Sequence, residues 1–337
     1  MSGPVRATVV GAGAWGTALA MLLERNGHDV CIWSYETEVA AAINEERRNP
    51  YLEGVPLPGR LRAETDLAAA VRGAGLVVSA SPSPFVRRLM GEAAAHLEPE
   101  VLLVSATKGI ELDTLLRMDE VLTEVLPAGA MARFCALSGP SFAKEVAAGA
   151  PTAVVIGSHD RAAAERASML FQTASFRIYT NSDVVGVELG GALKNVIALA
   201  AGTTAGLGYG HNTLAALITR GLAEITRLGL AVGAQKDTFY GLAGVGDLVL
   251  TCTGSLSRNR TVGYRLGCGE SLEQILSDMA GVAEGVKTTG AALELARRHG
   301  VEMPITEEMY AILYEGRSAD EALRALMARD PKPEGWS

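Results

Sequence analysis

The stretch that decides the fold is ATVVGAGAWG, residues 7–16, close to the N-terminus. Its β-branched residues predict a strand, and Gly11, Gly13 and Gly16 then follow the G-x-G-x-x-G spacing. A strand before this pattern and a helix after it are the context in which it binds a dinucleotide. Gly11 permits a tight turn, Gly13 lets the backbone approach a pyrophosphate, and Gly16 allows close packing of helix on sheet. The alternative is a structural turn that binds no ligand.

Downstream of this turn, short apolar runs alternate with helical patterns as far as residue 180. The runs that predict strands are DVCIW (29–33), GLVVSA (75–80), VLLVSA (101–106), FCALSG (134–139), TAVVIG (152–157) and FRIYT (176–180). Such alternation of strand and helix is typical of a mainly parallel, doubly wound Rossmann-type sheet. We therefore predict an α/β fold for this half of the chain.

The pattern changes around residues 181–183. Beyond them we find no convincing strand, and the sequence reads as helices rich in Ala, Leu and Gly, broken by TGSLSRN at 253–259. We predict two domains: a dinucleotide-binding Rossmann domain over residues 1–183, and an all-helical substrate-binding and catalytic domain over residues 184–337.

Composition narrows the class of protein. Of the 337 residues, 48% are hydrophobic, enough for a large core, and the net charge is −8. An acidic chain is not generally attracted to nucleic acid or to anionic membranes, so an anionic substrate would need a local basic pocket. The glycine-rich helices over 188–229 could support a homodimer, although packing within one chain explains them as well.

We also expect a cytoplasmic protein that binds no metal. The N-terminus lacks the charged and apolar regions of a signal peptide, and no apolar run reaches the roughly 18 residues of a membrane span. The four cysteines show no C-x-x-C spacing, which fits reduced thiols. The histidines lack metal-ligand spacing, and we expect all five to be structural: His28, His96, His159, His211 and His299.

The choice of nicotinamide nucleotide depends on the end of the second predicted strand, in CIWSYETE (31–38). An acidic residue there typically binds the ribose 2′-hydroxyl of NAD. Here neutral Ser34 and Tyr35 stand at that point, which removes repulsion against the 2′-phosphate of NADP, whereas Glu36 could serve NAD. The sequence thus allows NADP or NAD as cofactor and favours NADP.

The most informative stretch for chemistry is ELGGALKNVIALAAG (188–202), because it places one ammonium, that of Lys194, in a helix suited to burial. Desolvating an unpaired charge is expensive, so something should pair with it or use it. Gly190 and Gly191 cost about 1 kcal/mol each relative to alanine inside a helix, which indicates that something else fits beside the lysine. We interpret Lys194 as functional. A plain salt bridge from Glu188 to Lys194 is the structural alternative.

Four further stretches carry polar residues where loops or burial are expected. They are SATKGIE (105–111), LSGPSFAKEV (137–146), GVGDLVLTCTGSLSRNR (244–260) and GVAEGVKTTG (281–290). Lys108 follows a predicted strand, at the carboxyl edge where doubly wound sheets bind ligands. Gly139 and Pro140 lead into a predicted helix whose first turn could offer the Ser141 hydroxyl and backbone N–H groups.

Each of these polar residues also has a structural explanation. Lys108 could be a solvated loop lysine, and Asp247 could be a helix cap. Arg258 and Arg260 could be a surface pair. The residues by themselves leave these alternatives open.

Taken together, these stretches resemble the bacterial NAD(P)-dependent glycerol-3-phosphate dehydrogenases. GAGAWGTALA, TKGIE, LSGPSFAKEV, ELGGALKNVIALAAG, GLAGVGDLVLTCTGSLSRNR and VAEGVKT stand in the order of that family, from Gly11 to Thr288. Hydroxyacyl-CoA and 6-phosphogluconate dehydrogenases have the glycine-rich turn and a similar helical second domain, but LSGPSFA and SLSRNR argue against them. The resemblance implies reversible reduction of dihydroxyacetone phosphate to sn-glycerol 3-phosphate, which feeds glycerophospholipid synthesis.

The resemblance also implies roles for individual residues, with Lys194 as the catalytic lysine. The residues expected at the substrate are Lys108, Gly139, Ser141, Lys194, Asn195, Asp247, Ser257, Arg258 and Asn259. The residues expected at the cofactor, from the turn and the resemblance together, are Gly11, Gly13, Ala14, Trp15, Gly16, Ser34, Tyr35, Lys108, Ala143, Arg258, Val282 and Glu284. Many relatives have a basic residue just after the second-strand Trp, where this chain has Ser34 and Tyr35.

Reduction of a ketone puts negative charge on its oxygen, so we expect protonated Lys194 to polarise that oxygen and then donate the proton. Asp247 and Asn195 would position the ammonium or the substrate hydroxyls, and Arg258 would clamp the phosphate. Two other functions compete with this one. The chain could be a related dehydrogenase for another phosphorylated or acyl substrate, or a catalytically silent nucleotide-binding protein that senses redox state.

Overall fold

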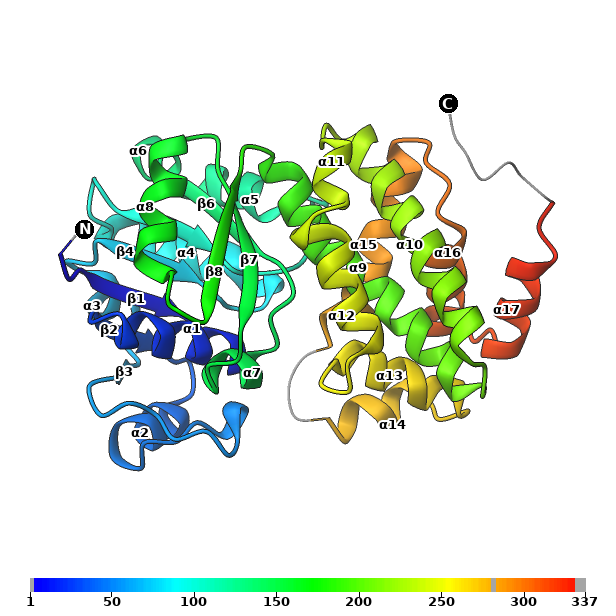
Figure 1. Cartoon of the computed structure of the whole chain (residues 1–337), viewed down its shortest axis with the longest axis horizontal. Coiled ribbons are helices and arrows are strands. Elements are labelled where there is room, and N and C mark those ends of the chain that lie inside the picture. The colour runs from blue at the N-terminus through cyan, green and yellow to red at the C-terminus, as the bar shows by residue number, and fades with distance from the viewer. Residues whose placement is uncertain (1–2, 280–282, 331–337) are drawn as a thin grey trace.

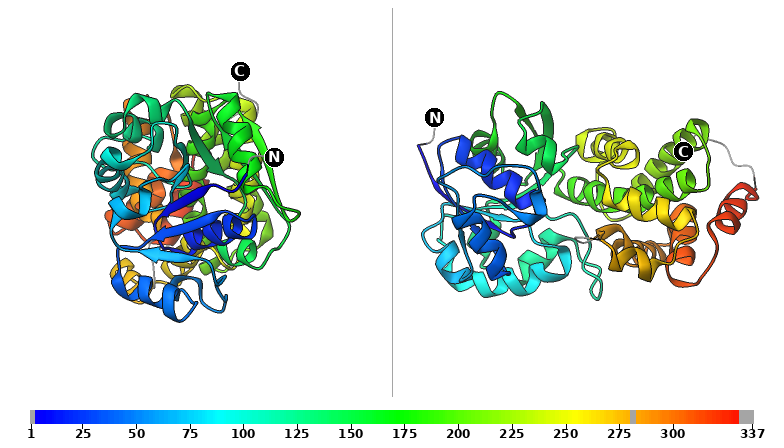
Figure 2. Two further views of the ribbon diagram at one scale, coloured as in Figure 1. Left: turned by 90° about the vertical axis from the view of Figure 1, so that its left-hand side faces the viewer. Right: turned by 90° about the horizontal axis from the view of Figure 1, so that it is seen from below.

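The computed structural model describes residues 3–279 and 283–330, in a sheet-containing part and a helical part that lie side by side (Figure 1). The two parts are also side by side when the molecule is seen from below (Figure 2). The last strand ends at Asn181, and the long helix that begins the helical part starts at Val184. None of the described residues after Asn181 lies in a strand, which confirms the predicted helical second half.

Eight strands form one sheet, in the order β3-β2-β1-β4-β5-β6-β7-β8. They are β1 (Arg6–Val10), β2 (Asp29–Trp33), β3 (Arg62–Glu64), β4 (Leu76–Ser79), β5 (Leu102–Ser105), β6 (Phe134–Ser138), β7 (Thr152–Gly157) and β8 (Phe176–Asn181). All neighbours are parallel except β6 and β7. The strand order reverses beside β1, which confirms the doubly wound, Rossmann-type sheet.

Seven of these strands lie where the apolar runs predict them, and β3 is the one that the sequence does not reveal. Its three residues, RAE, contain no apolar run. They can be polar because β3 is an edge strand, and its Arg62 is exposed.

Helices cover both faces of the sheet. α1 (Ala14–Arg25), α2 (Thr37–Glu45), α7 (Ala143–Ala147) and α8 (Arg161–Phe171) pack on one face. α3 (Leu67–Val71), α4 (Ser83–Ala93), α5 (Met118–Val125) and α6 (Ala128–Met131) pack on the other, and η1 (Pro50–Leu52) and η2 (Ala94–His96) are single turns. Because successive strand residues face opposite sides, Val9 lies in the first core and Val10 in the second.

The helical part is built around α9 (Val184–Gly206), which is buried along almost its whole length. It packs against α10 (His211–Ala231), α12 (Asp247–Thr253), α13 (Arg258–Gly267) and α15 (Glu284–Arg298) (Figure 1). The remaining helices are α11 (Lys236–Phe239), η3 (Leu242–Gly246), α14 (Leu272–Ser277), α16 (Pro304–Tyr314) and α17 (Ala319–Met327).

Glycines let α9 and α13 approach each other at backbone distance. A Cβ added to Gly202 would lie 2.0 Å from the carbonyl oxygen of Arg260. A Cβ added to Gly263 would lie 1.9 Å from the carbonyl oxygen of Leu199. The glycines of these two helices therefore serve packing within one chain.

The long helix α9 bears on the expectation that no apolar run reaches the length of a membrane span. Within the described residues this helix is long and apolar enough to cross a membrane, and a bent pair over 236–253 and 258–267 would be as well if it formed one span. An uninterrupted apolar run of about 18 residues does not occur in this helix, because Glu188, Lys194 and Asn195 divide it, but its 23 residues are apolar on average. The apolar stretch of this helix is 94% buried inside the protein, so neighbouring helices cover its apolar surface.

Candidate active site

The glycine-rich turn joins β1 to α1 at the carboxyl edge of the sheet. Gly11 has a φ of +126°, and a Cβ added there would lie 2.8 Å from the backbone of Ala80. A Cβ on Gly16 would lie 2.1 Å from the carbonyl oxygen of Gly11. Around Gly13 a Cβ would meet no described atom within 4 Å. This open face lies at the N-terminus of α1, where free N–H groups favour an anion, so a pyrophosphate fits there.

The other residues expected at the nucleotide differ in exposure. Ala14 and Trp15 begin α1, and the buried Nε1 of Trp15 has no hydrogen-bond partner among the described residues. Tyr35, just after β2, is 73% exposed. Ser34 is buried, and its hydroxyl donates to the carbonyl oxygen of Glu36 (2.9 Å). The expected pair of neutral side chains is therefore reduced to one that faces outward, Tyr35.

One oxygen of the carboxylate that could serve NAD is engaged, because Glu36 Oε1 accepts a hydrogen bond from the Tyr51 hydroxyl (3.1 Å). Beside Tyr35 lies an open groove of about 500 Å³ that includes Arg88 and His96. Arg88 lies in α4 and His96 in η2, the turn that follows α4. No sequence pattern connects these residues with β2, so their position in the groove beside Tyr35 could not be predicted from the sequence.

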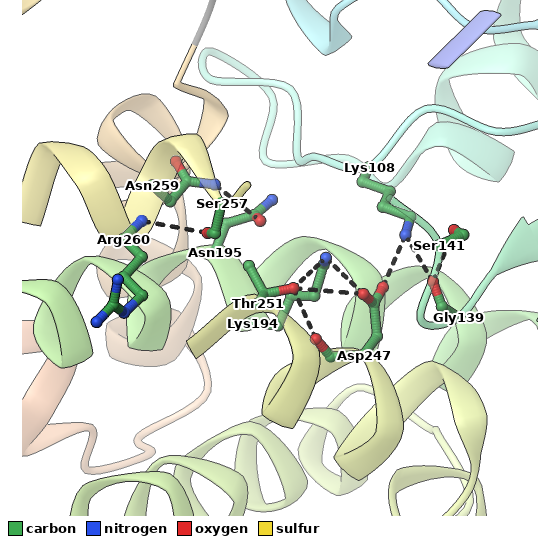
Figure 3. Close-up of polar contacts among 10 residues, drawn as sticks. All are labelled: Lys108, Gly139, Ser141, Lys194, Asn195, Asp247, Thr251, Ser257, Asn259 and Arg260. Atoms are coloured by element: carbon green, nitrogen blue, oxygen red, sulfur yellow. Dashed lines mark hydrogen bonds and ion pairs between the residues drawn. The ribbon is translucent and has the colours of Figure 1, made fainter. Parts of the chain in front are cut away.

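Three charged side chains meet where the sheet adjoins the helical part (Figure 3). Lys194 Nζ, from the middle of α9, donates to Asp247 Oδ1 and to Thr251 Oγ1, both at 2.7 Å. Lys108 Nζ, from the loop after β5, donates to Asp247 Oδ2 at 2.7 Å and to the carbonyl oxygen of Gly139 at 3.2 Å. The Asp247 carboxylate thus bridges two ammonium groups, and this pairing compensates the burial of Lys194, which is 7% exposed.

Close backbone approaches bring Asp247 to the two lysines. α12 begins at Asp247, directly after η3. A Cβ added to Gly190 would lie 2.4 Å from the carbonyl oxygen of Ala243, in η3, and one added to Gly191 would lie 2.5 Å from Ser138 Oγ. The space beside Lys194 is therefore filled by the protein itself. The groups that the sequence predicts beside Lys194 are therefore η3 and Ser138 of β6.

Burial lowers the pKa of the Lys194 ammonium group to about 8; Asp247 opposes this effect and Lys108 adds to it. Burial also works to raise the pKa of Asp247, but the two ammonium groups outweigh it and hold that pKa below its ordinary value. Asp247 is therefore ionised near neutral pH, where Lys194 can both gain and lose a proton. A group with this property is suited to general acid–base catalysis.

The structure decides three of the alternatives that the sequence leaves open. Lys108 is a paired residue and not a solvated one, since its side chain is 15% exposed and bridged to Asp247. Asp247 binds the two lysines with its carboxylate oxygens and is not a helix cap. Within the described residues, Glu188 makes no salt bridge to Lys194, and its Oε2 accepts the backbone N–H of Asp119 (3.1 Å).

A second polar group lies at the start of α13 (Figure 3). Asn259 Nδ2 donates to Asn195 Oδ1 (2.9 Å), and Asn259 Oδ1 accepts the backbone N–H of Gly285 (3.0 Å). Ser257 caps α13, because its hydroxyl accepts the backbone N–H of Arg260 (3.2 Å). These bonds tie α9, α13 and α15 together. Asn195 therefore braces the helices through Oδ1 and makes no hydrogen bond to the lysine ammonium within the described residues, and its expected contact with the substrate hydroxyls stays a prediction.

Positive charge gathers around Glu284, the first residue of α15. Burial raises the pKa of its carboxyl group to about 7, and Arg258, Lys108 and Lys194 act to lower it. Arg258 is exposed at the surface. Three cationic side chains thus act on one buried carboxyl group, in a chain whose net charge is −8. Val282, also expected at the cofactor, lies outside the described residues.

The segment after β6 differs from the expected helix start. α7 begins at Ala143, two residues after Ser141, whose hydroxyl donates to the carbonyl oxygen of Gly139 (2.9 Å). Gly139 has a φ of +129°, and its carbonyl oxygen also accepts the bond from Lys108. The Ser141 hydroxyl is therefore not part of a helical first turn; it braces the carbonyl group that holds Lys108.

Thr251 is a residue of the cluster to which sequence reasoning gives no role. Its hydroxyl accepts from Lys194 and donates to the carbonyl oxygen of Asp247 (2.6 Å). The available signal is its spacing, since residues i and i+4 share one helix face and Thr251 follows Asp247 by four positions.

Family models match both parts of the chain. Residues 6–164 match the model of the NAD-dependent glycerol-3-phosphate dehydrogenase N-terminus, and residues 183–324 match that of the C-terminus. The chain belongs to the NAD-dependent glycerol-3-phosphate dehydrogenase family. Membership agrees with the motif order found in the sequence, which confirms the resemblance.

Individual members of this family are similar along the whole chain. The glycerol-3-phosphate dehydrogenase (NAD(P)+) of Geobacter sulfurreducens is 56% identical over 332 residues, which cover 98% of this chain and 99% of the relative. That of Geobacter metallireducens is 57% identical over 327 residues, with 97% and 98% covered. The crystal structure of a glycerol-3-phosphate dehydrogenase from Coxiella burnetii has a TM-score of 0.92 at 36% identity, with 97% and 99% covered. The fold extends further, to a PanE/ApbA family ketopantoate reductase from Ralstonia eutropha (TM-score 0.58, 17% identity, 94% and 99% covered).

Proposed function

We propose that the chain reversibly reduces dihydroxyacetone phosphate to sn-glycerol 3-phosphate, with Lys194 as general acid and base, and so supplies glycerophospholipid synthesis. As a member of its family, the chain is an oxidoreductase that uses NAD or NADP. The observation that carries the role of Lys194 is its buried ammonium group, 2.7 Å from the carboxylate of Asp247, which also binds Lys108 at the carboxyl end of β5.

The hydrogen bonds of Lys194 support this mechanism. The nicotinamide, when bound, supplies the hydride for the ketone carbon. An ammonium group has three N–H donors, and Lys194 uses two on Asp247 and Thr251, which leaves one for the ketone oxygen. As that oxygen becomes anionic, Lys194 donates its proton. In the reverse direction, neutral Lys194 removes the proton from the alcohol.

Charge supports a phosphorylated substrate. The positive charges of Arg258, Lys108 and Lys194 all act on the Glu284 carboxyl group, so these three side chains surround the same part of the molecule. Arg258 is exposed, and its planar guanidinium can bind a phosphate through two parallel hydrogen bonds. We propose Arg258 as the phosphate clamp, with Lys108 as a contact for both substrate and cofactor.

The function is tested by comparing kcat/KM for dihydroxyacetone phosphate and for unphosphorylated dihydroxyacetone, each with NADPH and with NADH. We expect a strong preference for the phosphorylated ketone. Faster turnover of another phosphorylated or acyl substrate would favour a related dehydrogenase. Nucleotide binding without turnover of any ketone would favour a silent redox sensor.

The pH dependence should differ between the two directions. The rate of ketone reduction should fall as pH rises through about 8, because burial lowers the pKa of Lys194 to about 8 and reduction needs the protonated form. Alcohol oxidation should rise over the same interval, because it needs the neutral form. Measuring kcat in both directions from about pH 6 to pH 10 checks this. A reduction rate that stays constant to pH 10 would contradict the assignment of Lys194.

Arg258→Ala should raise KM for dihydroxyacetone phosphate by about 10- to 100-fold, because it removes charge-assisted hydrogen bonds to the phosphate. KM for unphosphorylated dihydroxyacetone should change little. The matched control is Arg220→Ala, which removes an exposed arginine from α10. An unchanged KM for the phosphorylated ketone would remove Arg258 from the phosphate site.

Four further points belong to this proposal. NADP is the favoured nucleotide, since the outward-facing side chain after β2, Tyr35, is neutral. The chain divides into a nucleotide domain (1–183) and a catalytic domain (184–337), supported by the change from strands to helices at that point. The protein acts in the cytoplasm, supported by its free cysteines among the described residues. The division into two domains is compatible with a homodimer. Measuring the molecular mass of the protein in solution tests whether it dimerises.

A further inference from the structure

A small cavity lies behind the Lys108 loop, between β5, β6 and α9. Its lining includes Ser105 and Lys108 from β5 and the loop, Ser138 from β6, and Val187 and Glu188 from α9. Within this cavity, the centre of a water molecule can occupy a volume of about 10 Å³. That is close to the least volume that holds one water, and too little for a larger ligand.

Three of the lining residues carry oxygen atoms that are buried and have no hydrogen-bond partner among the described residues. They are Ser105 Oγ, Ser138 Oγ and Glu188 Oε1; the Glu188 carboxyl group is also within side-chain hydrogen-bond reach of Asp119. The three side chains are 2%, 4% and 9% exposed. Leaving such groups unsatisfied is costly, and a buried water typically makes two to four bonds of this kind. Size and lining therefore both match one water molecule.

The other carboxyl oxygen of Glu188 is hydrogen-bonded to the backbone of the segment that follows Lys108 in the chain. Glu188 Oε2 accepts the backbone N–H of Asp119, in the first turn of α5, at 3.1 Å. Asp119 in turn pairs with Arg117 (3.1 Å). Burial raises the pKa of Glu188 well above its ordinary value, the charge of Asp119 and a side-chain hydrogen bond with Asp119 add to this, and Arg117 opposes it. These surroundings favour the protonated acid, in which one oxygen can donate a hydrogen bond and the other can accept one.

The loop between Lys108 and α5 is also anchored in the helical part. Ile110 and Leu115 are 2% and 5% exposed and lie in the core built around α9. Leu115 has a φ of +62°, a conformation that non-glycine residues seldom adopt, so this anchoring holds the backbone in an unfavourable state. A contact from α9 that fixes the loop would offset part of this cost.

We propose that the cavity binds one ordered water molecule, held by Ser105, Ser138 and Glu188, and that Glu188 is a positioning residue that fixes the Lys108 segment against α9. Glu188 touches neither substrate nor cofactor in this proposal. Glu188 acts on Lys108 through the loop and the water. The proposal rests on the proposed function for the role of Lys108. It assigns a purpose to an acid that does not pair with Lys194.

The test compares Glu188→Ala with Glu188→Gln. Glu188→Ala should lower kcat/KM for dihydroxyacetone phosphate by about 10- to 100-fold, mainly through KM, because a displacement of about 1 Å is enough for such a loss. Glu188→Gln should restore kcat/KM to nearly that of the unmodified protein, because the amide has the shape of the neutral acid and can both donate and accept. Equal damage by both substitutions would overturn the proposal, and so would unchanged kinetics in both.

Glu224→Gln is the matched control for the loss of a buried carboxyl group. Glu224 is 2% exposed and accepts the backbone N–H groups of Ile305 and Thr306, at the start of α16. The substitution should lower Tm and leave KM unchanged. A rise in KM for Glu224→Gln equal to that for Glu188→Ala would show a general effect of stability and overturn the positioning role.

Two further measurements do not depend on turnover. A high-resolution crystal structure of the unmodified protein should show one water within hydrogen-bond distance of Glu188 Oε1, and a cavity without density would overturn the water site. Calorimetry should show weaker binding of sn-glycerol 3-phosphate to Glu188→Ala and near-normal binding to Glu188→Gln. If the unmodified protein bound sn-glycerol 3-phosphate but did not reduce dihydroxyacetone phosphate, the proposed function would fail while this inference stayed testable.

Discussion

Lys194→Ala is expected to lower kcat for reduction of dihydroxyacetone phosphate by about 10²- to 10⁴-fold, which is the usual contribution of general acid–base catalysis. The substitution removes the proton donor and the hydrogen bond to the ketone oxygen. Affinity for the nucleotide should stay nearly unchanged, because the glycine-rich turn lies between β1 and α1, in the sheet-containing part, whereas Lys194 lies in α9 of the helical part. Steady-state kinetics and nucleotide titration measure the two effects.

The Lys194→Ala protein should also fold, because Asp247 keeps its ion pair with Lys108 (2.7 Å) and is not left as an isolated buried charge. The matched control is Lys236→Ala, which removes an exposed lysine from α11 and should leave kcat unchanged. If Lys194→Ala turned over at a rate close to that of the control, Lys194 would not be the acid.

Asp247→Asn is expected to damage both stability and chemistry. The neutral amide leaves the ammonium groups of Lys194 and Lys108 together without a counter-charge, in a place where Lys194 is 7% exposed. Removing one partner of a buried ion pair lowers the free energy of unfolding by about 3–5 kcal/mol. Without the carboxylate, the pKa of Lys194 should fall below about 8, so the loss of ketone reduction should move to lower pH.

Urea denaturation and the pH profile of kcat measure these two consequences of Asp247→Asn. The control is Asp237→Asn, at an exposed position on α11, which should change neither. Unaltered stability together with an unshifted pH profile would mean that Asp247 does not hold the two lysines in charge balance.

The sequence predicted the cluster of Lys194, Lys108 and Asp247 as single residues of separate motifs. Their pairing could not be predicted, because residues 108, 194 and 247 are brought together by packing of the loop after β5, α9 and α12 (Figure 3). Local roles were harder to predict. Asn195 braces α13 and Ser257 caps it, and polar groups of this kind take whichever partner the fold places near them.

The residues that follow β2, which are expected at the nucleotide, show the same limit of prediction from sequence. Ser34 and Tyr35 are adjacent in sequence, yet one is buried against Glu36 and the other is 73% exposed. Both residues lie after the end of β2, where the chain bends at Tyr35, so a motif names both residues and only the backbone path tells which one faces outward.

The sequence by itself determined the Rossmann-type sheet, the helical second half, the family, and Lys194 as the residue of greatest interest. These follow from apolar periodicity, glycine spacing and motif order, which are local properties of the chain. The tertiary structure alone decided that η3 and β6 pack closely against the glycines beside Lys194 and that Asp247 pairs with two lysines. It also decided that Glu188 binds the backbone of α5. The physical reason is that the energy of a buried charge depends on which groups surround it, and those groups come from distant parts of the chain.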